Sequence, residues 1–501
     1  MGFVTSFDPR TGAVVGTVSE TSHDEVRQLT RRAAGAAEAV AAAPLVERRG
    51  WLRAIADGVD ACAEELVRIA DRETGLGAAR LIGEVARVAG QLRFYADVAA
   101  EGSHLAVTID EETENNPWLG RVNRPLGAVA VFGASNFPFA FSVLGNDTAS
   151  ALAAGCPVVV KAHPAHALLS ERLSEIAQHA LRRAGAPEGT LAMVAGVQAG
   201  VDLVTAAEIT AVGFTGSQRG GMALWCLANE RETVIPVYAE MGTVNPVVLT
   251  PASGHLIDVL AKGFVDSFTL GSGQYCTKPG LMLAPRSALA PQAVARALRD
   301  SSVAPVMLTE SIAEEINRSL SELQEAGAEV VESLEATGEG WSANAAVLSA
   351  PIDALVPGSR LLEECFGAVA LVVEYDDIDD VLSALDRLQG ALVASVMSDG
   401  KDDIDAASLV RKLSARVGRV AVNSWPTGVA YSWAQQHGGP WPATSHPGTT
   451  SVGAAALDRW VRPVTYQGVP DSWLPEPLRA SNPWHVPRRV NGRIRPPEAT
   501  T

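Results

Sequence analysis

The chain has 501 residues, of which 47% are hydrophobic and 19% charged, and its formal net charge at pH 7 is −17. A chain of this length is expected to form two or three domains with large apolar cores. The acidic balance argues against nucleic acid or an anionic membrane as a partner, because both require basic patches. No stretch has the sustained apolar character of a membrane-spanning helix, so we expect a soluble protein.

The cysteines are few, odd in number and widely spaced, without a C-x-x-C pair: Cys62, Cys156, Cys226, Cys276 and Cys365. This pattern suggests neither a disulfide framework nor a zinc site, and we expect no metal. The first residues show no charged region followed by an apolar segment, so we expect no secretory signal. These features favour the reducing cytoplasm as the location.

The N-terminal part is predicted to form a hairpin and a helical lobe. Residues 7–12 have turn character and precede a strand at 13–18. Residues 24–100 are rich in Ala, Leu, Arg and Glu at helical spacing, which predicts about three long helices. Residues 104–123 break this pattern with mixed polarity, which indicates an irregular or hairpin excursion and a candidate oligomer contact.

From residue 127 onward, predicted strands alternate with predicted helices. Continuous apolar runs of strand length lie at 127–133, 157–161, 191–194 and 211–215, with helices at 149–154 and 169–185. Such runs are typical of strands buried on both faces of a parallel sheet. We therefore expect an open α/β sheet with right-handed crossovers, which binds ligands at the carboxyl ends of its strands.

A second α/β lobe is predicted beyond residue 240. Its expected elements are strands at 281–284 and 369–375 and helices at 257–270, 312–326 and 381–388. The tail after residue 451 is rich in Pro and Trp and too apolar for a flexible linker. We expect it to pack on the body of the protein or on another subunit.

Cys276 lies in the segment GSGQYCTKPG at 271–280, between a helical run and an apolar strand. Glycines permit unusual backbone conformations and close approach of a ligand, so this segment can present the thiol to a cleft. An isolated cysteine is more often a buried packing residue. Three further motifs favour a functional role, namely GASNFP at 133–138, EMGTVNP at 240–246, which is predicted to be a loop, and EECFG at 363–367.

These four motifs, in this order, resemble those of the aldehyde dehydrogenase superfamily, and the resemblance extends from Phe7 to about Arg479. The segments FGASNFPFAF, PVYAEMGTVNP and WPTGVAYSWAQQHGGPWPATS are similar to the branch that holds 2,5-dioxopentanoate (2-oxoglutarate-semialdehyde) dehydrogenases and NADP-dependent fatty-aldehyde dehydrogenases. The implied fold is α/β with two open-sheet lobes and a small oligomerisation element. The implied domains are 1–105 with 124–240 for the cofactor, 241–450 for catalysis, and 106–123 with 451–501 for assembly as a homodimer or homotetramer.

The resemblance implies oxidation of an aldehyde through a covalent thioester. Cys276 matches the nucleophile, since thiolate addition creates the tetrahedral centre from which hydride leaves. The side-chain amide of Asn136 and the backbone N–H of Cys276 match the donors that stabilise the oxyanion. Glu240 matches the general base that activates water to hydrolyse the thioester.

The dinucleotide fingerprint G-x-G-x-x-G is absent, but FTGSQRGG at 214–221 follows a strand and opens a helix, where a pyrophosphate can bind. By resemblance, Glu364 and Phe366 contact the nicotinamide ribose and ring, and Lys161 contacts the adenosine ribose. The predicted cofactor-binding residues are Lys161, His163, Gly216, Ser217, Gly221, Met241, Gly242, Glu364 and Phe366. Pro164 replaces a glutamate that repels a 2′-phosphate in many NAD-dependent members, so we favour NADP and leave NAD open.

The resemblance favours 2,5-dioxopentanoate as substrate, with a broad aliphatic or aromatic aldehyde dehydrogenase as the alternative. Residues 444–449 lack an arginine that this branch often carries, so no cation for a substrate carboxylate is assigned. An acylating, coenzyme-A-dependent enzyme usually lacks the glutamate found here as Glu240. A cysteine hydrolase would need a histidine base, either His255 or His437. A catalytically silent scaffold would be expected to have lost Cys276, Asn136 or Glu240.

Overall fold

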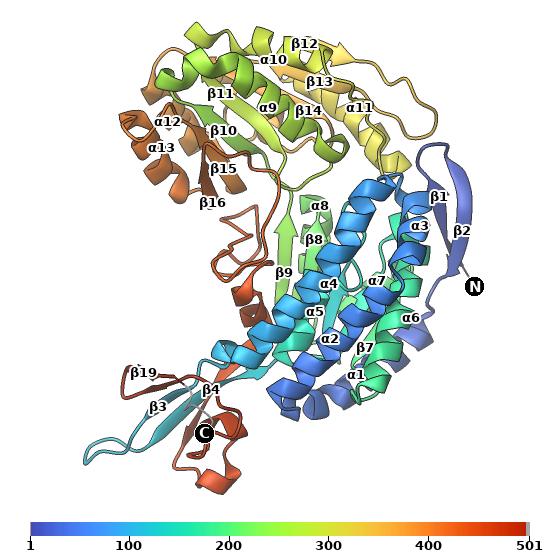
Figure 1. The fold of residues 1–501 in the computed structure, drawn as a ribbon, viewed down its shortest axis with the longest axis vertical. Coiled ribbons are helices and arrows are strands. Elements are labelled where there is room, and N and C mark those ends of the chain that lie inside the picture. Colours follow the sequence, from blue (N-terminus) through green and yellow to red (C-terminus); the bar gives the residue numbers. More distant parts are fainter. Residues whose placement is uncertain (1, 497–501) are drawn as a thin grey trace.

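The computed structural model describes residues 2–496, so the predicted first domain and C-terminal tail each extend beyond it, at residue 1 and at 497–501 (Figure 1). The predicted hairpin is confirmed by β1 (Phe3–Asp8), which pairs antiparallel with β2 (Ala13–Ser19). The helical lobe has four helices rather than about three: α1 (His23–Ala42), α2 (Leu45–Ala61), α3 (Ala63–Thr74) and α4 (Ala78–Glu101). Their apolar faces form one core with the first sheet.

The predicted parallel sheet has five strands in the order β7-β6-β5-β8-β9. Its strands are β5 (Val129–Phe132), β6 (Val158–Lys161), β7 (Leu191–Val194), β8 (Ala211–Gly216) and β9 (Val237–Met241), and its helices are α5 (Asn146–Ala154), α6 (Ala167–Arg183), α7 (Val197–Thr205) and α8 (Gln218–Asn229). The prediction that Glu240 lies in a loop was wrong. It belongs to β9 and pairs in register with Thr215 of β8, and the strand ends one residue later.

A seven-stranded sheet forms the second lobe, in the order β12-β13-β14-β11-β10-β15-β16, and only β12 runs antiparallel to its neighbour. The strands are β10 (Asn245–Leu249), β11 (Pro279–Pro285), β12 (Glu329–Leu334), β13 (Ala345–Ser349), β14 (Val369–Tyr375), β15 (Ala391–Met397) and β16 (Val417–Val422). The helices are α9 (Ile257–Thr269), α10 (Ala290–Arg299), α11 (Glu310–Glu325), α12 (Ile378–Arg387) and α13 (Ile404–Ser414). In Figure 1 this lobe lies at the top, and β9 points toward it.

The excursion at 104–123 and the tail together build a third, small sheet in the order β17-β4-β3-β18-β19. Its strands are β3 (Thr108–Asp110), β4 (Leu119–Pro125), β17 (Val461–Gln467), β18 (Arg488–Val490) and β19 (Arg493–Arg495). The tail therefore packs on the body of the same chain, and Trp460, just before β17, is fully buried in the core of the helical lobe. Within residues 2–496, no helix is long and apolar enough to cross a membrane.

Candidate active site

The loop that carries Cys276 is fixed from both sides. After α9 ends, Gly271, Ser272 and Gly273 all have positive φ, and a Cβ on Gly273 would overlap the backbone of Gly367. The glycine is therefore required where the loop presses against the EECFG motif. On the other side, Asn245 Nδ2 donates hydrogen bonds to the carbonyls of Cys276 and Lys278, each at 2.9 Å. Both contacts hold the thiol in place.

Three side chains from distant parts of the chain converge at the thiol. His437 Nε2 lies 3.6 Å from Cys276 Sγ and 2.9 Å from Glu240 Oε1, and the hydroxyl of Ser451 donates to Glu240 Oε2. His437, Glu240 and Ser451 are buried, whereas Cys276 is half-buried. His437 Nε2 is thus close to both the sulfur and the carboxylate, and it can accept a proton from the thiol.

The carboxylate of Glu240 keeps one oxygen available. The 2.9 Å separation of Oε1 from His437 Nε2 is an ion-pair distance, but no described residue donates an aligned hydrogen bond to Oε1. The segment that follows β16 explains the placement, since Thr444 forms a β-bridge with Glu240 and the backbone N–H of Met241 donates to Ala443. A free carboxylate oxygen beside the thiol is suited to orient a water molecule.

Burial raises the pKa of the Cys276 thiol well above its ordinary value, and the charges of Glu240 and Glu364 add to the rise. The thiol is therefore neutral at pH 7, and a nearby base is needed to form the thiolate. His437 Nε2 is positioned for that step. His255, the other histidine considered, is exposed and lies within ion-pair distance of Asp399 at the surface.

This raised pKa predicts how alkylation of Cys276 depends on pH. Below its pKa the thiolate fraction increases with pH, so the rate with iodoacetamide should rise about tenfold per pH unit from pH 7 to 9. Peptide mass spectrometry would follow Cys276 itself, with exposed Cys226 as the internal reference. A rate that is already constant below pH 8 would mean that the thiolate is preformed, contrary to the electrostatics.

Asn136 follows β5 and is buried against the loop of Cys276. Its side-chain Nδ2 donates to the backbone carbonyl of Gln274 at 2.9 Å, and its backbone carbonyl accepts from Arg80 Nη2 at 2.6 Å. A side-chain amide carries two N–H donors, so one remains for an oxyanion. The structure thus brings together Cys276, Glu240 and Asn136, the three predicted catalytic residues.

The predicted cofactor residues gather at the carboxyl ends of β6, β8 and β9. Ser217 is the N-cap of α8, where its Oγ accepts from the N–H of Gly220 at 3.2 Å. A Cβ on Gly221 would crowd the sulfur of Met241 at 2.8 Å, and a Cβ on Gly242 would overlap the carboxylate of Glu364. These close approaches bring the helix N-terminus, the end of β9 and the EECFG motif to one place.

Lys161 ends β6 and forms no ion pair with any described carboxylate, and burial lowers its pKa to about 8. Nδ1 of His163 is not available to a cofactor, because it accepts a hydrogen bond from the N–H of Ala165 at 3.1 Å. Burial also lowers the pKa of His163 well below its ordinary value, so the ring is neutral. Phe366 lies half-buried two residues beyond Glu364 in the same loop. Lys161 therefore supplies a cation at this edge.

We expect Gly242→Ala to weaken cofactor use. Gly242 does not have a left-handed φ, so alanine fits its backbone, but the new Cβ must displace the carboxylate of Glu364. The KM for the nicotinamide dinucleotide should increase about tenfold or more, because small displacements of binding groups are costly. Initial rates at fixed aldehyde would measure it. The control is Gly35→Ala in the exposed face of α1, where no atom lies within 4 Å of the new Cβ, and an equal KM change there would refute the explanation.

Several residues of the site were not predicted. Ser451 holds Glu240, and Asn245 and Lys278 hold the cysteine loop, with Lys278 Nζ donating to the carbonyl of Val369 at 2.7 Å. Asn245 lies in the EMGTVNP motif and Lys278 in the GSGQYCTKPG motif. Their polar character within these segments could have indicated a role in the site. His437 was considered only as a hydrolase base. No local pattern marks Ser451.

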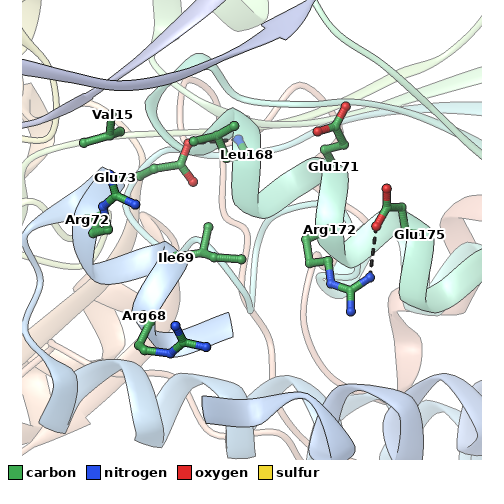
Figure 2. Close-up of a pocket in the computed structure, with 9 residues that line it drawn as sticks. All are labelled: Val15, Arg68, Ile69, Arg72, Glu73, Leu168, Glu171, Arg172 and Glu175. Carbon is green, nitrogen blue, oxygen red and sulfur yellow. Dashed lines mark hydrogen bonds and ion pairs between the residues drawn. The ribbon is translucent and has the colours of Figure 1, made fainter. Parts of the chain in front are cut away.

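A surface pocket of about 320 Å³ lies away from these residues, between α3 and α6 beside β2 (Figure 2). It is lined by Val15, Arg68, Ile69, Arg72, Glu73, Leu168, Glu171, Arg172 and Glu175, none of which is a predicted site residue. One of its carboxylates, Glu73, accepts from the N–H groups of Leu168 and Leu169 in the first turn of α6. That carboxylate therefore has a structural role.

Comparison with known proteins identifies the family of this chain. Residues 2–462 match the aldehyde dehydrogenase family. The chain is 43% identical to alpha-ketoglutaric semialdehyde dehydrogenase 2 of Azospirillum brasilense, covering 98% of this chain and 96% of that protein. It is 39% identical to alpha-ketoglutaric semialdehyde dehydrogenase of Acinetobacter baylyi, with coverages of 95% and 92%.

Solved structures show the same fold. A 1-pyrroline-5-carboxylate dehydrogenase from Thermus with bound NAD superposes with a TM-score of 0.80 at 20% identity, over 93% of this chain and 90% of that one. Lactaldehyde dehydrogenase from Escherichia coli gives a TM-score of 0.80 at 21% identity, over 93% and 95%. The predicted fold class is confirmed, and the chain belongs to the aldehyde dehydrogenase family.

Proposed function

We propose that this enzyme oxidises 2,5-dioxopentanoate to 2-oxoglutarate. NADP is the preferred hydride acceptor in this proposal, and NAD is the alternative. The observation that carries the choice of substrate is the 43% identity, over nearly the full length of both chains, to an enzyme named for alpha-ketoglutaric semialdehyde. The convergence of Cys276, His437 and Glu240 supports the chemistry.

In the first half of the reaction, His437 Nε2 accepts the proton of Cys276, and the sulfur adds to the aldehyde carbon. The N–H of Asn136 that is not donated to Gln274 then stabilises the oxyanion. A nicotinamide bound beside Cys276 would supply the hydride acceptor that the change from tetrahedral centre to thioester requires. The half-buried position of Cys276 lets the substrate reach the sulfur while most water is excluded.

In the second half, Glu240 orients and deprotonates a water molecule that hydrolyses the thioester. Its free oxygen Oε1 accepts the hydrogen bond of that water, while the hydroxyl of Ser451 keeps the carboxylate in place. As the thioester breaks, the sulfur takes back the proton held by His437, and Glu240 releases the proton of the water to solvent, which leaves the carboxylic acid and the free thiol of Cys276. This use of Glu240 disfavours transfer of the acyl group to coenzyme A.

The residues at the sheet edge fit a phosphorylated dinucleotide. Ser217 opens a twelve-residue helix whose N-terminal N–H groups suit a pyrophosphate. Glu364 lies against the end of β9, where a ribose could be held by its carboxylate. Lys161 supplies a cation without an acidic partner among the described residues, and Pro164 adds no carboxylate that would repel a 2′-phosphate.

A panel of initial rates tests this proposal. We expect kcat/KM to be highest for 2,5-dioxopentanoate among that compound, glutarate semialdehyde, hexanal and benzaldehyde, and higher with NADP than with NAD. If hexanal or benzaldehyde gave the highest value, the enzyme would be a broad aldehyde dehydrogenase. A higher kcat/KM with NAD would overturn only the cofactor preference.

We also propose that the small sheet is the oligomerisation element of a homodimer or homotetramer. It leaves β17 and β19 as edge strands, and two large apolar side chains are exposed, Ile494 on β19 and Trp473 in the segment after β17. Exposed edges and large apolar side chains favour association. Light scattering after size-exclusion chromatography would decide, and a monomer at micromolar concentration would refute this assignment.

A further inference from the structure

One face of α4 carries a row of polar side chains beside the catalytic centre. Arg80, Glu84, Arg87 and Gln91 are spaced by four, three and four residues, which places them on the same side of a helix. Arg80 Nη2 donates to the carbonyl of Asn136 and its Nε to Glu84, and Gln91 Nε2 donates to the carbonyl of Ala140 at 3.2 Å. This face therefore lines the segment that follows β5.

Arg87 differs from its neighbours because its charge is uncommitted. Its guanidinium lies over two aromatic rings, 5.3 Å from the centroid of Phe137 and 5.0 Å from that of Tyr431, and Nη2 donates to the carbonyl of Val429 at 3.2 Å. No carboxylate among residues 2–496 lies within ion-pair distance of it: Glu84 pairs with Arg80, although the charge of Arg87 also acts to lower the pKa of Glu84, against the larger effect of burial. The side chain is only half-buried, so it is open to a ligand.

The rings around Arg87 lead directly to the reacting thiol. Phe137 packs edge-on against Tyr275, the residue before Cys276, with centroids 5.0 Å apart. Phe141, 5.5 Å from Phe137, lies 6.3 Å from the ring of His437. The positive charge of Arg87 is also close enough to lower the pKa of Cys276, against the stronger effects of burial and acidic neighbours. An apolar wall with an arginine that forms no ion pair within residues 2–496 thus adjoins the nucleophile.

Two other arginines near the centre are less suitable. Arg80 is committed to Asn136 and Glu84, so moving it would disturb the predicted oxyanion donor. Arg419 on β16 is half-buried, and Nη2 donates to the carbonyl of Pro426. It is not among the cations that lie over the described rings around Arg87, and burial lowers its pKa against a smaller opposite effect of the charge of Cys276. Arg87 has both the free charge and the apolar surroundings.

We propose that Arg87 binds the carboxylate of the substrate, so that the carbon chain lies against Phe137 and Tyr431 and the aldehyde reaches Cys276. This assignment rests on the function proposed above, in which the substrate carries a carboxylate at the end opposite its aldehyde. A guanidinium held between two rings presents its N–H groups in a fixed plane, which suits paired hydrogen bonds to a carboxylate. It supplies the cation that residues 444–449 lack.

The test compares two substrates in the same variant. The specificity ratio is kcat/KM for 2,5-dioxopentanoate divided by kcat/KM for hexanal, which has no carboxylate. We expect Arg87→Gln to lower this ratio about 100-fold, because a site built for a charged group loses most of its preference without the partner. Arg87→Met, which keeps an apolar stem against the two rings, should give the same loss. The control is Arg183→Gln, at the exposed last residue of α6, where the ratio should not change.

The outcomes separate this assignment from the proposed function. A wild-type enzyme that does not prefer 2,5-dioxopentanoate to hexanal would refute the function and the assignment that rests on it. If both Arg87 variants kept the wild-type specificity ratio, the assignment to Arg87 would be refuted while the proposed function stood. If Arg419→Gln lowered the ratio instead, Arg419 on β16 would be the residue that binds the carboxylate. If both substrates slowed equally in the Arg87 variants, Arg87 would have a structural role only, and the assignment would fail.

Discussion

Replacing Cys276 with serine is expected to lower kcat by about 10⁴-fold or more, the scale on which loss of a catalytic nucleophile reduces turnover. Serine fills nearly the same space, so the loop held by Asn245 and Lys278 should keep its structure. Its hydroxyl, however, is far harder to deprotonate than a thiol, and His437 would have to remove that proton. The measurement is formation of the reduced nicotinamide at saturating aldehyde.

None of the other cysteines is placed to replace Cys276. Cys156 is fully buried, burial raises its pKa to about 11, and its sulfur donates to the carbonyl of Trp460. Cys365 is buried in the core of the second lobe, and Cys62 lies between α2 and α3 in the helical lobe. Cys226 is exposed on α8, so Cys226→Ser is a matched control that should keep normal turnover. More than a tenth of wild-type kcat in Cys276→Ser would mean that another group is the nucleophile.

The strands that could be predicted from the sequence are those buried on both faces. The runs at β5, β6, β7, β8 and β14 are nearly continuous in apolar residues and bounded by turn-forming residues. Their predicted positions therefore agree closely with those in the structure. β15 was not located although all seven of its residues are buried, because a short apolar run has no periodicity that separates it from a buried helix. Edge strands such as β12 are only partly buried and gave a weaker signal.

Glu240 shows a second kind of limit. The glycine and threonine that follow it favour a turn, and the sequence therefore placed the carboxylate in a loop. The structure extends β9 through Met241 because its backbone pairs with β8 on one side and with the segment at 443–445 on the other. Those partners come from parts of the chain that a local pattern cannot relate to each other.

The same reason explains which site residues were found. Cys276, Asn136 and Glu240 each stand inside a recognisable motif, so resemblance identified them directly. His437 lies 161 residues from Cys276 in the chain, and its relation to the thiol depends on the return of the late segment over β9. Its pairing with Thr450 and Ser451 positions the imidazole, but nothing in those residues alone indicates a base.

Separate substitutions of Glu240 and His437 should divide the reaction into its two halves. In Glu240→Gln the thiol still has His437 at 3.6 Å, so the first turnover should proceed and release about one reduced nicotinamide per active site. Hydrolysis of the thioester should then be about 100-fold slower, because loss of a general base costs this much or more. Rapid-mixing absorbance would show a burst followed by a slow steady rate.

In His437→Gln we expect the first turnover to be slowed, in contrast to Glu240→Gln, where the later turnovers are slowed. Because the pKa of Cys276 is raised, few molecules carry the thiolate at pH 7, and without the imidazole the burst itself should slow about 100-fold. Raising the pH should restore part of that rate, since hydroxide replaces the missing base as the thiol ionises. A control substitution, Glu329→Gln on the exposed edge strand β12, should change neither phase.

These two variants also test the assignment of roles within the pair. If Glu240→Gln slowed the first turnover as strongly as the later ones, the carboxylate would act through His437 during attack rather than through water. If His437→Gln left the burst unchanged, Glu240 would be the base for both steps, and the 3.6 Å contact would be incidental. His437 Nε2 lies 3.6 Å from the sulfur and 2.9 Å from Glu240 Oε1, so the imidazolium formed by the proton leaving Cys276 is paired with the carboxylate. That geometry is why we expect the burst to depend on the histidine and the steady rate on the glutamate.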